Sequence, residues 1–323
     1  MDGAGRVTSP QKRPSAVAIR LFIDGAAGTT GLEIRERLQG RGEFELLVLD
    51  DAQRKDESAR RDALHAADIA ILCLPDEAAK DAVKLAEGAG TRIIDASSAH
   101  RVADGWTYGF PELIGREVIA GARYVSNPGC YPTGFLALVA PLVRAGLLPA
   151  GWPFTVNAVS GYSGGGNALI ERFEGDPDIA FRAYGLTMGH KHLAEMQTYA
   201  GLLHPPVFSP AVVPAHRGML VDVPLPLAAI PGAGSAAALH DCLEEFAAQA
   251  PLITFAGGNS TEELLRKGAP GADTMTLHLY ANADGTQARL IARLDNLGKG
   301  ASGAAIQNLN IMCGLPETAG LRL

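Results

Sequence analysis

The feature that most constrains the fold is a regular alternation of short apolar runs with amphipathic segments before residue 130. The run 16–23 predicts a buried strand, and the glycine-rich stretch 24–31 leads from it into a helical pattern at 32–38. The alternation continues with expected helices and strands at 44–49, 57–66, 68–74, 76–87, 91–94 and 124–126. Strands that alternate with helices form parallel sheets, so an α/β fold with a Rossmann-type dinucleotide-binding domain is predicted.

The stretch DGAAGTTG at residues 24–31 carries the dinucleotide signal. Its glycines, Gly25, Gly28 and Gly31, let the backbone approach a pyrophosphate at a helix N-terminus. No Gly-Lys-Ser/Thr follows, which excludes a P-loop. The spacing Gly-x-x-Gly-x-x-Gly is weak evidence by itself, because glycine turns are common where a strand meets a helix.

The residues after the second expected strand leave the choice between NAD and NADP open. Asp50 would bind a ribose 2′-hydroxyl, which favours NAD. Arg54 and Lys55 would instead bind a 2′-phosphate, which favours NADP. The solvated start of a helix explains these two basic residues equally well.

The stretch SNPGCYPTG at residues 126–134 places a cysteine at the junction between the two halves of the chain. Asn-Pro-Gly is a turn signal, and Pro132 suits the first turn of a helix that continues through 135–148. Cys130 is therefore expected just ahead of a helix N-terminus, whose dipole and free N–H groups lower a thiol pKa. A lowered pKa would enrich the thiolate and make Cys130 a nucleophile. The alternative is that Cys130 is a small buried packing residue.

Beyond Cys130 the pattern changes. Strands are expected at 154–159, 207–213, 219–223, 274–281 and 288–294, with helices at 235–249 and 303–313. They predict a second, α+β domain with a mixed or antiparallel sheet. The run SGYSGGG at 160–166 exposes backbone N–H groups and hydroxyls that suit an anionic substrate, or forms a flexible turn.

The composition limits the partners. The chain of 323 residues has 47% hydrophobic residues and a net charge of −7, which argues against a nucleic-acid or anionic-membrane binder. No apolar run is long enough to span a membrane. Four cysteines without a CxxC pair fit a reducing cytoplasm better than a disulfide framework. The polar residues 1–15 lack the apolar core of a signal peptide, so a disordered leader is expected.

The densest basic cluster is His190-Lys191-His192. In an extended segment the two imidazoles would address one site, whereas in a helix they would diverge. A histidine near Cys130 would act as general acid–base, and the alternative is a pair of surface histidines. A metal site is not expected, because no third ligand cluster accompanies the pair. Four other histidines form no such cluster and are expected to be structural: His65, His204, His240 and His278.

Several stretches together resemble the N-acetyl-gamma-glutamyl-phosphate reductase family, in its shorter, type 2 variant. They lie at residues 22–38, 93–101, 108–113, 126–134, 160–166, 189–192 and 299–310. The family is related to aspartate-semialdehyde dehydrogenase. The resemblance implies an NADP-binding domain of residues 16–129 and 297–323, and a catalytic and oligomerisation domain of residues 130–296. It also implies a homodimer or homotetramer.

The resemblance further implies roles for individual residues. Cys130 would be the nucleophile, and His192, favoured over His190, would be the acid–base. NADP would be bound by Gly25, Ala27, Gly28, Thr29, Thr30, Gly31, Arg54, Asn296 and Lys299. The substrate would contact Arg101, Asn127, Ser160, Gly161, Ser163 and Lys191. Longer members carry His-Arg-His, and Lys191 lacks the bidentate fork of that arginine.

The expected reaction is the NADPH-dependent reductive dephosphorylation of an acyl phosphate, N-acetyl-L-glutamyl 5-phosphate, through a thioester on Cys130. Phosphate and N-acetyl-L-glutamate 5-semialdehyde would be the products, in arginine biosynthesis. One alternative is a reductase of another acyl phosphate, such as aspartate-semialdehyde dehydrogenase. A second alternative is a nucleotide-sensing protein without catalysis, for which an unusually reactive Cys130 would have no use.

Overall fold

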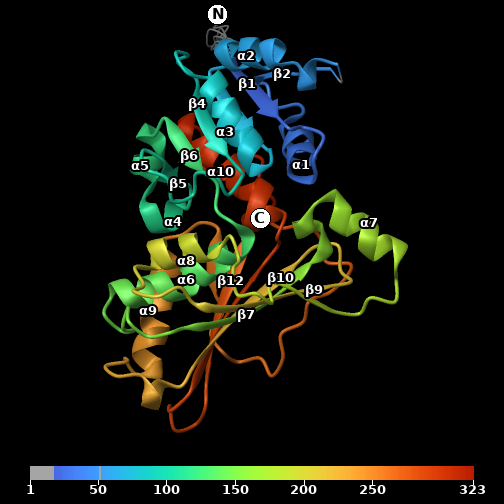
Figure 1. Ribbon diagram of the computed structural model, residues 1–323. Helices are drawn as coiled ribbons and strands as arrows, with labels where there is room; N and C mark the ends of the chain where they lie inside the picture. The colour runs from blue at the N-terminus through green and yellow to red at the C-terminus, as the bar shows by residue number, and fades with distance from the viewer. Residues whose placement is uncertain (1–17, 51) are drawn as a thin grey trace, which may run out of the picture.

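The computed structural model describes residues 18–50 and 52–323. The expected leader at 1–15 lies outside the described residues. Figure 1 shows two units, each built on its own sheet, with the N-terminal unit above the second one. None of the helices in the described part of the chain is long and apolar enough to cross a membrane.

The first unit contains the predicted parallel sheet. Six strands lie in the order β2-β1-β3-β4-β6-β5, and every neighbouring pair is parallel. The strands are β1 (Ile19–Asp24), β2 (Phe44–Leu47), β3 (Ile69–Leu72), β4 (Arg92–Asp95), β5 (Thr107–Tyr108) and β6 (Tyr124–Ser126). The α/β prediction is confirmed. Only β5 was not predicted, because a strand of two residues leaves no periodic pattern.

Helices cover this parallel sheet. They are α1 (Thr29–Leu38), α2 (Glu57–Ala66), α3 (Asp76–Leu85), α4 (Pro111–Ile114) and α5 (Arg116–Gly121), together with the returning helix α10 (Gly303–Met312). Every residue of α10 is buried, and its Ala305 and Leu309 pack in one core with Ile71 and Ile94 of the sheet. The last helix therefore brings the chain back to the first unit, as Figure 1 shows in red.

The second unit contains a seven-stranded mixed sheet, in the order β11-β12-β13-β10-β7-β9-β8. Two pairs, β7–β9 and β11–β12, are parallel, and the other pairs are antiparallel. This confirms the predicted mixed sheet. The strands are β7 (Thr155–Gly161), β8 (Arg182–Ala183), β9 (Val207–Val213), β10 (Met219–Leu225), β11 (Ile253–Phe255), β12 (Met275–Ala281) and β13 (Ala288–Leu294).

Three helices cover one face of the mixed sheet: α6 (Cys130–Arg144), α8 (Leu193–Ala200) and α9 (Ala236–Ala248). A fourth, α7 (Asn167–Gly175), lies to one side below α1 (Figure 1). Helix α6 approaches the sheet closely at Gly134, where a Cβ atom would lie 2.8 Å from Val221 Cγ2. This close packing holds α6 against β10 and β13 of the mixed sheet.

A buried ion cluster ties the first unit to the second. Arg37, on α1, donates to both carboxylate oxygens of Asp273 at 2.6 and 2.7 Å, and Asp273 is fully buried. The backbone N–H of Arg322 donates to the same carboxylate at 2.7 Å. Arg37 also donates to Glu33 at 2.5 Å. Helix α1, which begins at the glycine turn, is thereby held against the second unit.

We predict that Asp273→Ala destabilises the protein strongly, because it leaves the Arg37 guanidinium buried without its main partner. The free energy of unfolding should fall by about 3–5 kcal/mol. The matched control is Asp222→Ala, whose partner Arg289 is 60% exposed, and there the loss should be at most about 1 kcal/mol. Chemical denaturation of both variants checks this. Equal losses would show that the cluster contributes no more than a surface pair.

Candidate active site

Cys130 is the first residue of α6, and the extended Gly129 is its N-cap. The helix therefore begins at the cysteine itself, not just after it as the sequence suggested. The turn between β6 and α6 places Cys130 at the carboxyl end of the parallel sheet, where α/β proteins bind their ligands. No side chain caps the helix, so its first N–H groups remain free to face an anion.

Cys130 lines a cavity of about 840 Å³ between the two units. Walls from both units bring most of the predicted site residues together here. From the first unit and the junction come Gly28, Thr29, Thr30, Gly31, Arg101 and Asn127. From the second unit and the return segment come Ser160, Gly161, Ser163, His190, Lys191, His192 and Asn296. One space therefore contains the glycine turn, the nucleophile candidate and the histidine cluster.

The buried carboxylate of Glu195 organises the centre of this site. It is 1% exposed and accepts hydrogen bonds from Arg101 Nη1 at 2.7 Å, the Tyr108 hydroxyl at 2.7 Å and the Gly129 backbone N–H at 3.0 Å. It also lies 4.0 Å from His192 Nε2. Glu195 thus links α8 to the first sheet and to Gly129, the residue before Cys130.

The backbone at Cys130 is enclosed on both sides by close contacts. A Cβ atom at Gly129 would lie 2.6 Å from Arg101 Nη1 and 2.7 Å from both Glu195 Oε1 and His192 Nε2. A Cβ atom at Gly300 would lie 2.8 Å from Cys130 Cβ. Gly300 belongs to a π-helical turn, Gly298–Ser302, of a kind that is frequent at functional sites. Only glycine fits at these two positions.

The expectation of a lowered thiol pKa is wrong for this form of the protein. Burial raises the pKa of Cys130 to about 11, although Arg101 and the backbone N–H of Tyr131 act in the opposite direction. Desolvation of the thiolate exceeds the benefit of the helix N-terminus because the cysteine is packed under Gly300. The thiol is therefore protonated at neutral pH and needs a base to become a nucleophile.

The two histidines gather at one place. Their ring centroids are 4.6 Å apart, and the His190 Nδ1 atom accepts the backbone N–H of His192 at 3.2 Å. Burial holds the pKa of His192 well below its ordinary value and lowers that of His190 to about 4. Both rings are therefore neutral at pH 7. His192 Nδ1 is buried and has no hydrogen-bond partner among the described residues.

Two predicted binding residues have other partners. Lys299 is 1% exposed, and its Nζ atom donates to Glu112 and Gln307, each at 2.6 Å, so it does not line the cavity. A buried ammonium needs such acceptors, and here they come from α4 and α10. The Asn127 side chain donates to the Ala301 carbonyl at 3.0 Å. This hydrogen bond fixes the π-helical turn, and Asn127 also lines the cavity.

A second pocket, of about 650 Å³, adjoins the glycine turn. Gly25, Ala27, Gly28 and the predicted Arg54 line it, together with Arg35, Lys55 and Arg60. A side chain at Gly25, which has φ +87°, would overlap the Cys73 carbonyl, so this turn requires glycine. Asp50 lines neither pocket, because its carboxylate accepts the N–H groups of Ala52 and Gln53.

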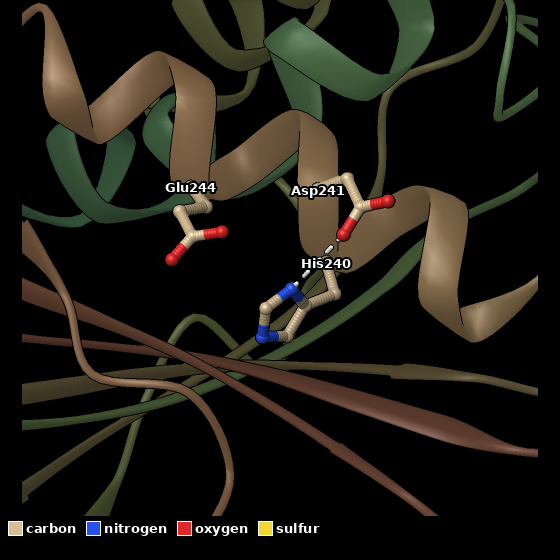
Figure 2. A group of neighbouring side chains, drawn as sticks. All are labelled: His240, Asp241 and Glu244. Atoms are coloured by element: carbon tan, nitrogen blue, oxygen red, sulfur yellow. Dashed lines mark hydrogen bonds and ion pairs between the residues drawn. The ribbon is translucent and has the colours of Figure 1, made fainter.

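The described residues contain one group of three side chains that could hold a metal ion: His240, Asp241 and Glu244. Figure 2 shows them along one side of α9, with an ion pair of 3.4 Å between His240 and Asp241. Both acidic residues are exposed, and α9 contributes nothing to the cavity around Cys130. The group is a feature of the surface, separate from the site.

Sequence reasoning missed four residues of the site. They are Glu195, Tyr108, Tyr184 and Arg182, of which the last two line the cavity. One signal was available for Glu195: an acidic residue three positions after His192 lies on the same face of a helix. The others lie on short strands or turns, where no periodic pattern marks the inward face.

Two family models match the chain. Residues 20–122 match the NAD binding domain of semialdehyde dehydrogenase, and residues 130–296 match the dimerisation domain of semialdehyde dehydrogenase. The chain is 48% identical over 319 residues to N-acetyl-gamma-glutamyl-phosphate reductase from Trichormus variabilis, covering 94% of this chain and 99% of the relative. The enzyme of the same name from Brucella ovis is 50% identical over 306 residues, covering 91% and 99%.

Solved structures share the fold at lower identity. Aspartate semialdehyde dehydrogenase II from Vibrio cholerae, complexed with ASA, has a TM-score of 0.67 at 19% identity and covers 93% of this chain and 99% of its own. Aspartate semialdehyde dehydrogenase from Candida albicans, with NADP, has a TM-score of 0.62 at 16% identity and covers 92% and 98%. At such identities the comparison concerns the architecture alone.

We predict that Gly129→Ala lowers kcat/KM by about 100-fold or more, since a methyl group there displaces Arg101, Glu195 or His192. The matched control is Gly189→Ala, where an added Cβ atom meets nothing within 4 Å. Steady-state kinetics and thermal unfolding of both variants separate a site effect from loss of the fold. A fully active Gly129→Ala protein would contradict the close packing described here.

We also predict that alkylation of Cys130 by iodoacetamide accelerates with pH, without a plateau near neutrality. A thiol with a pKa of about 11 gains about tenfold in thiolate for each pH unit between roughly pH 7 and pH 9. Mass spectrometry of the labelled peptide measures the rate at Cys130, and Cys130→Ser is the control. A rate independent of pH in this range would mean that the thiolate is already formed.

Proposed function

We propose that this chain, which belongs to the N-acetyl-gamma-glutamyl-phosphate reductase family, converts N-acetyl-L-glutamyl 5-phosphate into N-acetyl-L-glutamate 5-semialdehyde with NADPH as reductant. This is a step of arginine biosynthesis. The observation that carries the proposal is the identity of 48% with a reductase of that name across 94% of the chain. The cavity supports it, because a cysteine, a neutral histidine and the glycine turn line the same space.

We propose Cys130 as the nucleophile and His192 as its base. Neutral His192 accepts the thiol proton, and the Cys130 sulfur attacks the acyl carbon, so that phosphate leaves and a thioester remains. The same proton passes from His192 to the departing phosphate. Arg101 and the N–H groups at the start of α6 stabilise the negative charge that develops on the acyl oxygen.

NADPH, when bound, supplies the hydride that reduces the thioester carbonyl. Collapse of the resulting hemithioacetal releases the semialdehyde and returns the Cys130 sulfur as a thiolate. Because burial makes the thiolate of Cys130 unfavourable, it takes up the one proton that the overall reaction consumes. That proton comes from solvent, and we propose that His192, neutral again after protonating the phosphate, relays it. His190 holds the His192 backbone through the bond to its Nδ1 atom, and this positions the acid–base ring.

The nucleotide pocket supports NADP over NAD. The start of α1 has no side-chain cap, so its N–H groups suit a pyrophosphate. Arg35, Arg54, Lys55 and Arg60 line the adjoining pocket and suit a 2′-phosphate. Arg60 also donates to Asp24 at 2.8 Å, which fixes its position at the end of β1. Asp50 binds its own turn and is not proposed as a ribose ligand.

The proposal also covers the organisation of the chain. Residues 16–129 and 297–323 would form the NADP-binding domain, and residues 130–296 the catalytic and oligomerisation domain. The packing of α10 in the core of the first sheet supports this division. The match of residues 130–296 to a dimerisation domain supports a homo-oligomer, either a dimer or a tetramer.

The reverse reaction tests the proposal. Native protein, N-acetyl-L-glutamate 5-semialdehyde, phosphate and NADP⁺ should give phosphate-dependent NADPH formation, and NAD⁺ should be a poorer oxidant. Cys130→Ser should lose this activity by about 10⁴-fold or more while still binding NADPH, because the loss of a nucleophile removes the covalent route.

The controls separate the alternatives. Aspartate semialdehyde is offered in parallel. A preference for it would identify the protein as an aspartate-semialdehyde dehydrogenase. Absence of activity with both substrates would favour a nucleotide-binding protein without catalysis. Turnover by Cys130→Ser near that of the native protein would remove Cys130 from the mechanism.

A further inference from the structure

A row of three residues crosses the mixed sheet beneath the cavity. In the register of the strands, Arg182 of β8 faces Val212 of β9, and Val212 faces Ser160 of β7. Residues that are directly paired on neighbouring strands project to the same side of a sheet. All three line the cavity that contains Cys130. The edge strand β8 therefore directs an arginine toward the same space as the nucleophile.

The guanidinium of Arg182 is held without an acidic partner. It lies 4.7 Å from the centroid of the Tyr184 ring, and its residue is half-buried. No carboxylate forms an ion pair with it among the residues that the structure describes. Arg101, in contrast, is bound to Glu195 at 2.7 Å. Arg182 thus keeps its hydrogen-bond donors available while stacking restricts its position.

Tyr184 connects this arginine to the nucleophile. Burial raises the pKa of the Tyr184 hydroxyl to about 12, Cys130 contributes to that rise, and Arg182 acts against it. A single hydroxyl group that responds to both charges lies within electrostatic range of both. The centroid of the Tyr184 ring also lies 5.6 Å from that of the His190 ring, so the tyrosine that stacks on Arg182 contacts the histidine cluster of the same cavity.

The two ends of the proposed substrate require two different cations. The phosphate is attached to the acyl carbon, which must meet Cys130, and Arg101 is the arginine whose charge acts on that sulfur. The α-carboxylate lies at the other end of the glutamyl chain. It therefore needs a cation that is set back from the nucleophile, and a guanidinium recognises a carboxylate through two parallel hydrogen bonds.

We propose that Arg182 binds the α-carboxylate of the substrate and so determines specificity for acyl phosphates that carry a carboxylate at their far end. This rests on the proposed function, because it concerns the substrate of the same site. Arg182 is a binding residue for the ground state and the transition state alike. Its loss should therefore raise KM for the organic substrate and leave kcat nearly unchanged.

The test compares Arg182→Met with the native protein in the reverse reaction, using N-acetyl-L-glutamate 5-semialdehyde and its α-methyl ester. For the acid, KM should rise by about 10- to 100-fold in Arg182→Met, as expected for a lost charge-assisted pair. The native protein should use the ester poorly, and Arg182→Met should hardly distinguish ester from acid. Arg182→Lys should recover part of the preference for the acid. KM for phosphate and for NADP⁺ should stay within about twofold of the native values.

Arg172→Met is the matched control, since Arg172 lines the same cavity but is exposed on α7. It should keep the native preference for the acid over the ester. The proposal is overturned if Arg182→Met discriminates against the ester as the native protein does. It is equally overturned if Arg182→Met mainly raises KM for phosphate, or if Arg172→Met is the variant that loses discrimination. Failure of the proposed function would look different, because the native protein itself would then show no phosphate-dependent activity.

Discussion

The site depends above all on one buried carboxylate. Glu195, on α8, accepts hydrogen bonds from Arg101, from Tyr108 and from the backbone N–H of Gly129. Burial of a carboxylate without these donors would cost roughly several kcal/mol of folding free energy. The carboxylate is therefore stable in this position only because the three donors bind it. Because Gly129 directly precedes Cys130, the same bonds set the position of Cys130 relative to the first sheet. Removal of the carboxylate would release an arginine, a tyrosine and the start of α6 together.

Buried ion pairs likewise hold the two units together. Helix α1 contributes the N–H groups of the glycine turn at one end and Arg37 further along, and Arg37 is bound to the buried Asp273. The cavity walls therefore come from units that cannot shift independently without exposing or unpairing these charges. These ion pairs therefore hold the glycine turn and Cys130 in one arrangement around the cavity.

Burial also explains the protonation states of the chemical groups. The environment that excludes water raises the pKa of Cys130 and lowers the pKa values of both histidines. Desolvation favours the neutral form of each group, so the resting pair is a thiol beside a neutral imidazole. Under the proposed mechanism a neutral His192 can accept a proton, whereas a charged imidazolium could not. The dipole of α6 favours the thiolate but does not decide the resting state.

Most strands and the longer helices could be predicted from periodicity, because apolar spacing records which face of each element is buried. The short strands β5, β8 and β11 and the helices α7 and α8 were not predicted. Local chemistry similarly marked the glycine turn, the turn before Cys130 and the histidine cluster. Several properties could not be read in this way, among them the role of Lys299, the raised pKa of Cys130 and the central place of Glu195. They depend on which distant segments pack together: Lys299 meets Glu112 and Gln307, and Arg182 reaches the cavity only through the pairing of β8 with β9. The amino-acid sequence alone thus specifies most of the longer elements and the residue types available for chemistry. Which charges are buried, paired or left free follows from tertiary packing, because burial and pairing are properties of contacts between distant segments.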